Sequence, residues 1–160
     1  MLGLLEVLLQ MTKLHKVIKL LNILKEIGKK SYPFQDIDQT YSEEDNSLLA
    51  VYYTFSTPKN PYKVTFYSGE YQPKDKTFDL SFGIDKGEGY KLDTFQMTGE
   101  GDAMAILSTV IEIIKDFLYQ YEDEGAETIV INPTSEKRRK IYQHLISRLP
   151  SDISSKVILK

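Results

Sequence analysis

Two glycines in the second half of the chain could form a turn that binds an anion. They stand in the stretch QMTGEG, residues 96–101, between a strand-like segment and the strongest helical pattern of the chain. Glycine lets a backbone approach a ligand closely, and the first N–H groups of a helix have no partner inside the helix. The pattern therefore indicates Gln96, Gly99 and Gly101 as candidate residues for binding a phosphate-like group.

Two carboxylates beside these glycines oppose an anionic ligand. Glu100 lies between the glycines, and Asp102 follows them at a position that suits a helix N-cap. Two like charges roughly 5 Å apart repel by about 3 kcal/mol at an effective dielectric constant near 20. That repulsion corresponds to about a hundredfold loss of affinity. Two interpretations stay open, namely a ligand-binding turn and a structural turn that Asp102 caps.

A basic run and a tyrosine follow on a later helical segment. The run KRRK, residues 137–140, is most simply a solvated face, and the alternative is a contact with phosphate, nucleic acid or an acidic partner. Tyr142 is either a core residue with a bonded hydroxyl or a catalytic acid. The chain has no cysteine, and its two histidines, His15 and His144, are too few for a histidine-based zinc site. We therefore expect no metal site.

The elements that must position these residues can be predicted from hydrophobic periodicity. Apolar residues recur at helical spacing in 2–27, 102–121 and 136–149, and period-2 or continuous apolar patterns indicate strands at 48–55, 62–67, 78–84, 90–98, 128–131 and 157–159. The polar segment 32–46 is expected to be a loop. Carboxylates on or near the strands, Asp79, Asp85 and Asp93, permit an acid–base pair, although solvent-facing alternation explains them equally well.

Composition and length favour one ordinary α+β domain. The chain has 160 residues, 41% of them hydrophobic, and a net charge of −3, which argues against binding nucleic acid through bulk charge. Residues 1–30 are expected to form an N-terminal amphipathic helix, and residues 31–160 the domain. The helix is most simply packed on the domain core, and the alternatives are a partner helix or oligomer seam and a membrane-surface helix. The string LEVLLQ, residues 5–10, is close to a protease-site linker, so an alternative is that residues 1–10 are a cloning remnant. The first residues lack the features of a secretory signal.

The order strand, glycine turn, helix, strand, helix in the second half resembles the acetyltransferase superfamily called GNAT. In that family a turn written Gln/Arg-x-x-Gly-x-Gly/Ala binds the pyrophosphate of acetyl-coenzyme A, and Gln96, Gly99 and Gly101 match it. A Leu-Tyr pair on the later helix often supplies a general acid toward the leaving thiolate. Ile141 and Tyr142 stand at the matching place. The resemblance implies a GNAT-like fold with an N-terminal helix, an antiparallel β-meander and then a β-turn-α-β-α-β unit.

The stretch FQMTGEGDA, residues 95–103, and the later Lys140-Ile141-Tyr142 also resemble uncharacterised tailed-phage proteins with a TGxGDA turn. This resemblance implies a viral origin, a location in the host cytoplasm or the virion, and a non-catalytic binding or virion-associated module without a cofactor. The alternative is an acyl-coenzyme A dependent N-acyltransferase, with acetyl-coenzyme A at Gly99 and Gly101 and Tyr142 as general acid. Expected partners are another protein, or a second copy through the N-terminal helix, and neither nucleic acid nor membrane.

Overall fold

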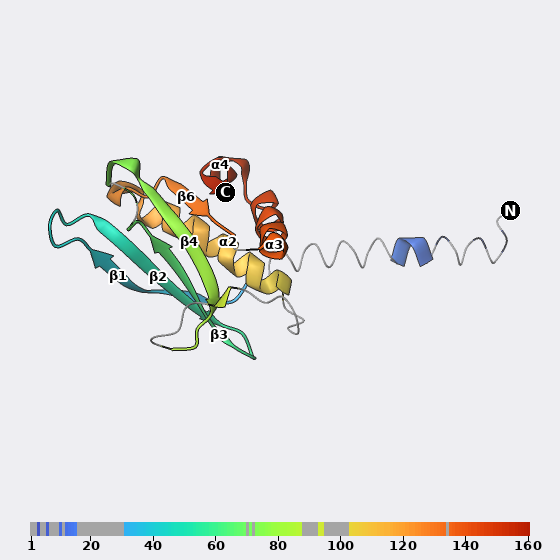
Figure 1. Ribbon diagram of the computed structural model, residues 1–160. Helices are drawn as coiled ribbons and strands as arrows, with labels where there is room; N and C mark the ends of the chain where they lie inside the picture. The colour runs from blue at the N-terminus through green and yellow to red at the C-terminus, as the bar shows by residue number, and fades with distance from the viewer. Residues whose placement is uncertain are drawn as a thin grey trace.

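The computed structural model describes residues 3, 6, 10, 12–15, 31–69, 71, 73–87, 93–94, 103–133 and 135–160. Figure 1 shows the described residues from 31 onward as one mixed sheet with helices behind it. Residues 12–15 are helical, and the Leu14 side chain is 59% exposed. Most of the helix predicted over 2–27 lies outside the described residues. In the part of the chain that the structure describes, no helix has the length and apolarity needed to cross a membrane.

Four antiparallel strands form the first part of the sheet. They are β1 (Phe34–Tyr41), β2 (Leu48–Ser56), β3 (Pro61–Tyr67) and β4 (Thr77–Ile84), with a short 3-10 helix η1 (Pro73–Asp75) before β4. Each pairs with its neighbour in the chain. The predicted period-2 alternation is confirmed, because one face of β2, β3 and β4 is buried. Its buried residues are Val51, Tyr53, Phe55, Tyr62, Val64, Phe66, Phe78, Leu80 and Phe82.

The strand β1 corrects the expectation of a loop over residues 32–46. It is an edge strand, paired only with β2 among the described strands, and most of its side chains are exposed. A strand that buries so little carries few apolar residues, so its sequence resembles a loop. The pairing shifts between Asp36 and Asp38, which leaves Ile37 as the extra residue of a bulge.

The second part of the sheet is parallel and consists of β6 (Thr128–Ile131) and β7 (Val157–Leu159). The helices of this half of the chain are α2 (Ala103–Gln120), η2 (Glu122–Glu124), α3 (Glu136–Ser147) and α4 (Ser151–Ser154). The strand order is β1-β2-β3-β4-β6-β7, and β6 pairs in parallel with β4 and with β7. The two-residue strand β5 (Asp93–Thr94) pairs with the far end of β4, and the rest of the predicted strand 90–98 lies outside the described residues.

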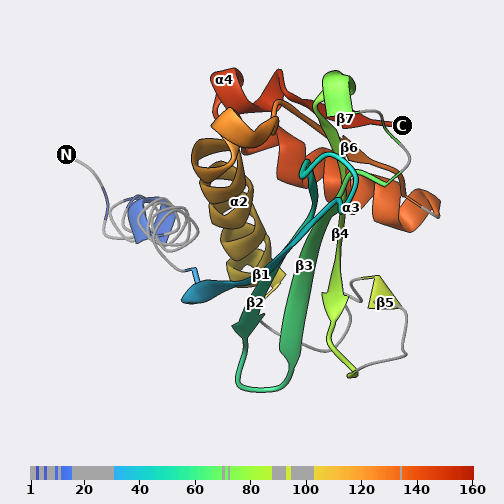
Figure 2. The same cartoon turned by 90° about the vertical axis from the view of Figure 1, so that its left-hand side faces the viewer.

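The helix α2 lies along one face of the sheet, as Figure 2 shows. Leu107 and Ile114 are fully buried and Ile111 is 8% exposed, as the broad apolar arc of this helix predicts. The ring of Phe117 stacks on the ring of Phe66 with centroids 3.9 Å apart. The buried residues of α2, α3 and the inner sheet face form one continuous core, so both helices are positioned by the same apolar layer.

Candidate functional site

The predicted anion-binding turn lies outside the described residues. Gln96, Gly99 and Gly101 belong to the segment 95–102, and so does Asp102, whose capping role was expected. The described part of α2 begins at Ala103, directly after that segment. The candidate site of the GNAT resemblance therefore stays a prediction.

Tyr142 lies in the core, at the contact between α3 and the sheet. Its side chain is 4% exposed, and its ring meets the Phe82 ring edge-on with centroids 5.7 Å apart. Burial raises the pKa of Tyr142 to about 12, and the positive charge of Arg138 acts in the opposite direction. The tyrosine that the sequence singled out thus packs as an aromatic core residue.

Three tyrosine hydroxyls donate hydrogen bonds to three carboxylates where β1 and β2 meet the end of α2. Tyr53 donates to Asp116 over 2.7 Å, Tyr41 donates to Glu124 over 2.9 Å, and Tyr121 donates to Asp36. We call this set the tyrosine–carboxylate network; it consists of Asp36, Tyr41, Tyr53, Asp116, Tyr121 and Glu124. Two glutamine amides also donate to it, from Gln39 to Asp36 and from Gln120 to Asp116.

The phenols of the network are held in their protonated form. Burial raises the pKa of Tyr53, and the hydrogen bond to Asp116 adds to that effect. Burial and the bond to Asp36 raise the pKa of Tyr121 in the same way. The pKa of Tyr41 is raised chiefly by its bond to Glu124. At neutral pH these hydroxyls are therefore donors that fasten β1 and β2 to α2 and η2, and they do not act as bases.

The network brings two acidic segments of the chain together. Glu43, Glu44 and Asp45 lie in the β1–β2 hairpin, and η2 consists of Glu122, Asp123 and Glu124. The bond from Tyr41 to Glu124 joins the hairpin to η2. No Lys or Arg occurs in residues 31–58 or 116–136. No group of acidic or histidine side chains within the described residues could hold a metal ion.

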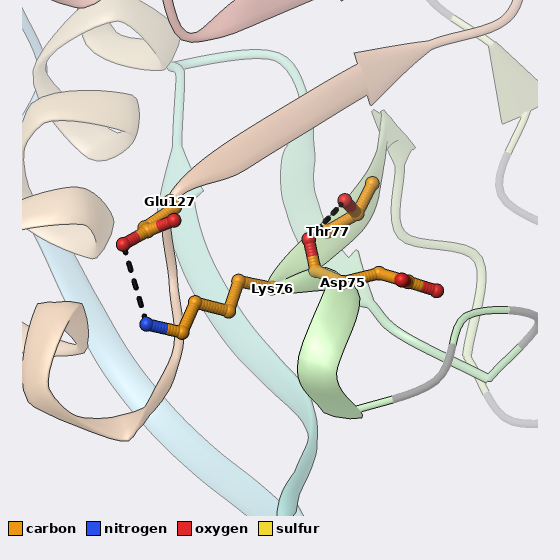
Figure 3. A network of polar contacts seen from close by, with 4 residues as sticks. All are labelled: Asp75, Lys76, Thr77 and Glu127. Atoms are coloured by element: carbon orange, nitrogen blue, oxygen red, sulfur yellow. Dashed lines mark hydrogen bonds and ion pairs between the residues drawn. The ribbon is translucent and has the colours of Figure 1, made fainter.

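A small cavity lies beside this acidic region, where β4 begins. Its volume is about 30 Å³, and it is lined by Ser47, Leu48, Ser68, Pro73, Lys76, Thr77, Phe78, Glu124 and Gly125. Figure 3 shows the polar contacts at its rim: Lys76 Nζ lies 3.4 Å from Glu127 Oε1, and Thr77 Oγ1 donates to the Asp75 carbonyl over 2.8 Å. A cavity of this size has room for one or two water molecules and not for a substrate.

The basic run lies on the first half of α3. Lys137 and Lys140 are exposed, and Arg139 faces Glu136 with its Nε 3.9 Å from Oε2 and donates to the Lys160 carbonyl. Ser135 caps the helix by accepting a bond from the Arg138 N–H over 3.2 Å. The run is therefore a solvent-facing surface on a capped helix.

The other candidates have local partners. Asp79 accepts a bond from the Tyr71 hydroxyl over 2.9 Å, and Asp85 accepts one from the Gly87 N–H over 2.9 Å. The Asp93 side chain is not described, so a carboxylate pair that includes it remains a prediction. His15 and His144 are both exposed.

Comparison with known proteins gives a family and no function. The model of a family of unknown function, DUF6934, matches residues 30–160. No curated protein and no solved structure matches this chain.

Proposed function

This chain belongs to the family of unknown function DUF6934, and we propose that it is a phage-type, GNAT-like protein that acts as a non-catalytic binding or virion-associated module. The parallel pair β4 and β6, separated in the chain by α2, supports the GNAT-like fold of the proposal. The residues that carry the resemblance to phage proteins support its phage-type, non-catalytic role.

The burial of Tyr142 is the observation that carries the proposal. A general acid must reach the leaving group of a bound substrate, within hydrogen-bond distance or through one water molecule. Tyr142 is 4% exposed and packs against Phe82, and burial raises its pKa, which weakens it as an acid. Each of these properties favours a core role for the side chain over a role in proton transfer.

The proposed module binds another protein, and residues 1–30 are a candidate contact to a second copy. The exposed Leu14 belongs to the apolar stripe predicted for this segment. The apolar core is built from Tyr32 onward, without any described residue of the N-terminal segment. Leu14 is therefore available to another chain. We expect neither a cofactor nor a nucleic-acid ligand.

Release of free thiol from acetyl-coenzyme A, measured with a panel of primary amines, tests the absence of catalysis. We expect the wild-type protein and Tyr142→Phe to release thiol at the rate of the buffer alone. The substitution removes only the hydroxyl, so the aromatic packing against Phe82 is kept. A wild-type rate above the buffer that falls roughly 100-fold or more in Tyr142→Phe would establish the alternative, an N-acyltransferase with Tyr142 as general acid and acetyl-coenzyme A as cofactor.

A further inference from the structure

The exposed face of α3 carries basic side chains. Lys137, Lys140 and His144 lie at spacings of three, four and seven residues, which places them on one side of a helix, and all three are exposed. We call these three residues the basic face. Among the described residues, no carboxylate forms an ion pair with Lys137 or Lys140. Their charges are therefore free to meet a negatively charged surface of another molecule.

Helix stability does not account for these cations. The N-terminus of a helix carries a partial positive charge, which favours acidic residues in the first turn and disfavours basic ones. In α3 the acidic Glu136 is followed at once by Lys137, Arg138, Arg139 and Lys140. Within the folded chain Arg139 faces Glu136 and donates to the Lys160 carbonyl. The dipole disfavours Lys137 in the first turn, and Lys137 and Lys140 are exposed, so these two lysines are the candidates for an interaction with another molecule.

A complementary surface stands at the other edge of the same molecule. We define the acidic end as the two carboxylate runs Glu43 to Asp45 and Glu122 to Glu124, which the Tyr41–Glu124 bond holds together. The hairpin bonds further fix this surface, because Asp45 accepts from the N–H and hydroxyl of Ser47. The six carboxylates are exposed. The bonds of Glu124 and Asp45 hold this surface in place in the unbound protein.

The sheet separates the two surfaces. The strand β1 with its hairpin is at one edge of the order β1-β2-β3-β4-β6-β7, and α3 packs beside β7 at the other edge, where Arg139 contacts Lys160. Figure 1 shows the β1–β2 hairpin at the left end of the domain and α3 on its right side. One copy cannot bring its own two surfaces into contact, whereas two copies placed head to tail can.

We propose that the basic face of α3 docks on the acidic end of a second copy of this chain. Charge complementarity selects this partner over a polyanion, because the net charge of −3 and the acidic end would repel a nucleic acid. The contact is heterologous, so it leaves one basic face and one acidic end open and can add further copies. This inference goes beyond the proposed function, since it holds whether or not the domain is catalytic.

Sedimentation velocity of the full chain tests the proposal at about 10 mM and about 1 M NaCl, between which the Debye length falls from about 30 Å to about 3 Å. We expect concentration-dependent association at low salt that is lost at high salt. Association through an apolar stripe in residues 1–30 would not weaken with salt, so the two contacts are distinguishable. A monomer at low salt throughout the concentration range would overturn the proposal.

Charge reversal identifies the two surfaces. Lys137→Glu with Lys140→Glu should weaken low-salt association roughly tenfold or more, and Glu43→Lys with Glu44→Lys should do the same. The four side chains are exposed, and acidic residues suit the start of α3, so both variants should stay folded. Lys74→Glu, a reversal at an exposed lysine on η1, is the control for a change of net charge and should have little effect.

Mixing the two charge-reversed variants tests whether the basic face and the acidic end contact each other. Lys137→Glu with Lys140→Glu puts two carboxylates on the basic face, and Glu43→Lys with Glu44→Lys puts two lysines in the hairpin of the acidic end. The substituted positions are then complementary between the two variants, so a one-to-one mixture should recover association at low salt. Failure of the mixture to associate would overturn the proposal. So would tight binding of a single-stranded oligonucleotide that is lost in the Lys137→Glu, Lys140→Glu variant, because that result would assign the basic face to a polyanion.

Discussion

Replacing Phe117 with alanine should lower the free energy of unfolding by about 3–5 kcal/mol. The Phe117 ring is fully buried and stacks on Phe66 at 3.9 Å, with Phe78 at 5.2 Å and Tyr121 at 5.6 Å between centroids. Removing it leaves a cavity and ends two aromatic contacts between α2 and the sheet, those with Phe66 and Phe78, and a third with Tyr121 directly after the helix. Urea denaturation followed by circular dichroism measures the loss.

Tyr119→Ala is the matched control on the same helix. The Tyr119 side chain is 85% exposed, so its removal should change the free energy of unfolding by no more than roughly 1 kcal/mol. A loss below about 1 kcal/mol for Phe117→Ala would show that α2 does not pack on the sheet through this ring.

Raising the pH above 10 should destabilise the domain steeply. In the unfolded chain a tyrosine loses its proton near pH 10. The folded-state pKa values of Tyr53, Tyr121 and Tyr142 are all raised by burial, that of Tyr142 to about 12. The folded state therefore binds more protons than the unfolded state above pH 10. The stabilisation is complete below pH 10 and is lost as the pH rises toward the folded-state values.

Each of these three groups should lower the free energy of unfolding by about 1.4 kcal/mol per pH unit, which makes about 4 kcal/mol per unit for the set. Denaturation curves at intervals between pH 8 and pH 12 measure the slope. Tyr53→Phe should reduce it by about one third, whereas Tyr119→Phe, at an exposed phenol, should leave it unchanged. Stability that stays constant to pH 12 would contradict the buried placement of these phenols.

Hydrophobic periodicity in the sequence predicted those helices and strands that bury a continuous apolar surface. The arc of α2 and the short apolar run of β6 are of this kind, since burial on so many positions leaves an unmistakable pattern. The strand β1 could not be predicted in this way. Most of its side chains are exposed, and a hydrogen bond from the Tyr32 N–H to Thr109, 77 residues away, helps to hold its start on α2.

The tyrosine–carboxylate network could not be predicted either. Its bonds join residues 63, 83 and 85 positions apart, and no local spacing encodes such pairs. By contrast, Tyr142 could be singled out because the resemblance to the GNAT superfamily implies a tyrosine at its place. Whether it packs or reacts depends on its surroundings, and the neighbouring ring of Phe82 is 60 residues away in the chain. The resemblance thus identified Tyr142, whereas its buried environment could be seen only in the folded structure.

Calorimetric titration with acetyl-coenzyme A is the most direct test of the claim that this domain is a non-catalytic module. Wild type and Asp102→Ala are titrated side by side at one salt concentration. We expect wild type to show no binding at millimolar ligand, because Glu100 and Asp102 oppose the pyrophosphate. Any latent affinity should rise in Asp102→Ala, which removes one of the two charges. Micromolar binding by the wild-type protein would contradict the claim and favour the acyltransferase.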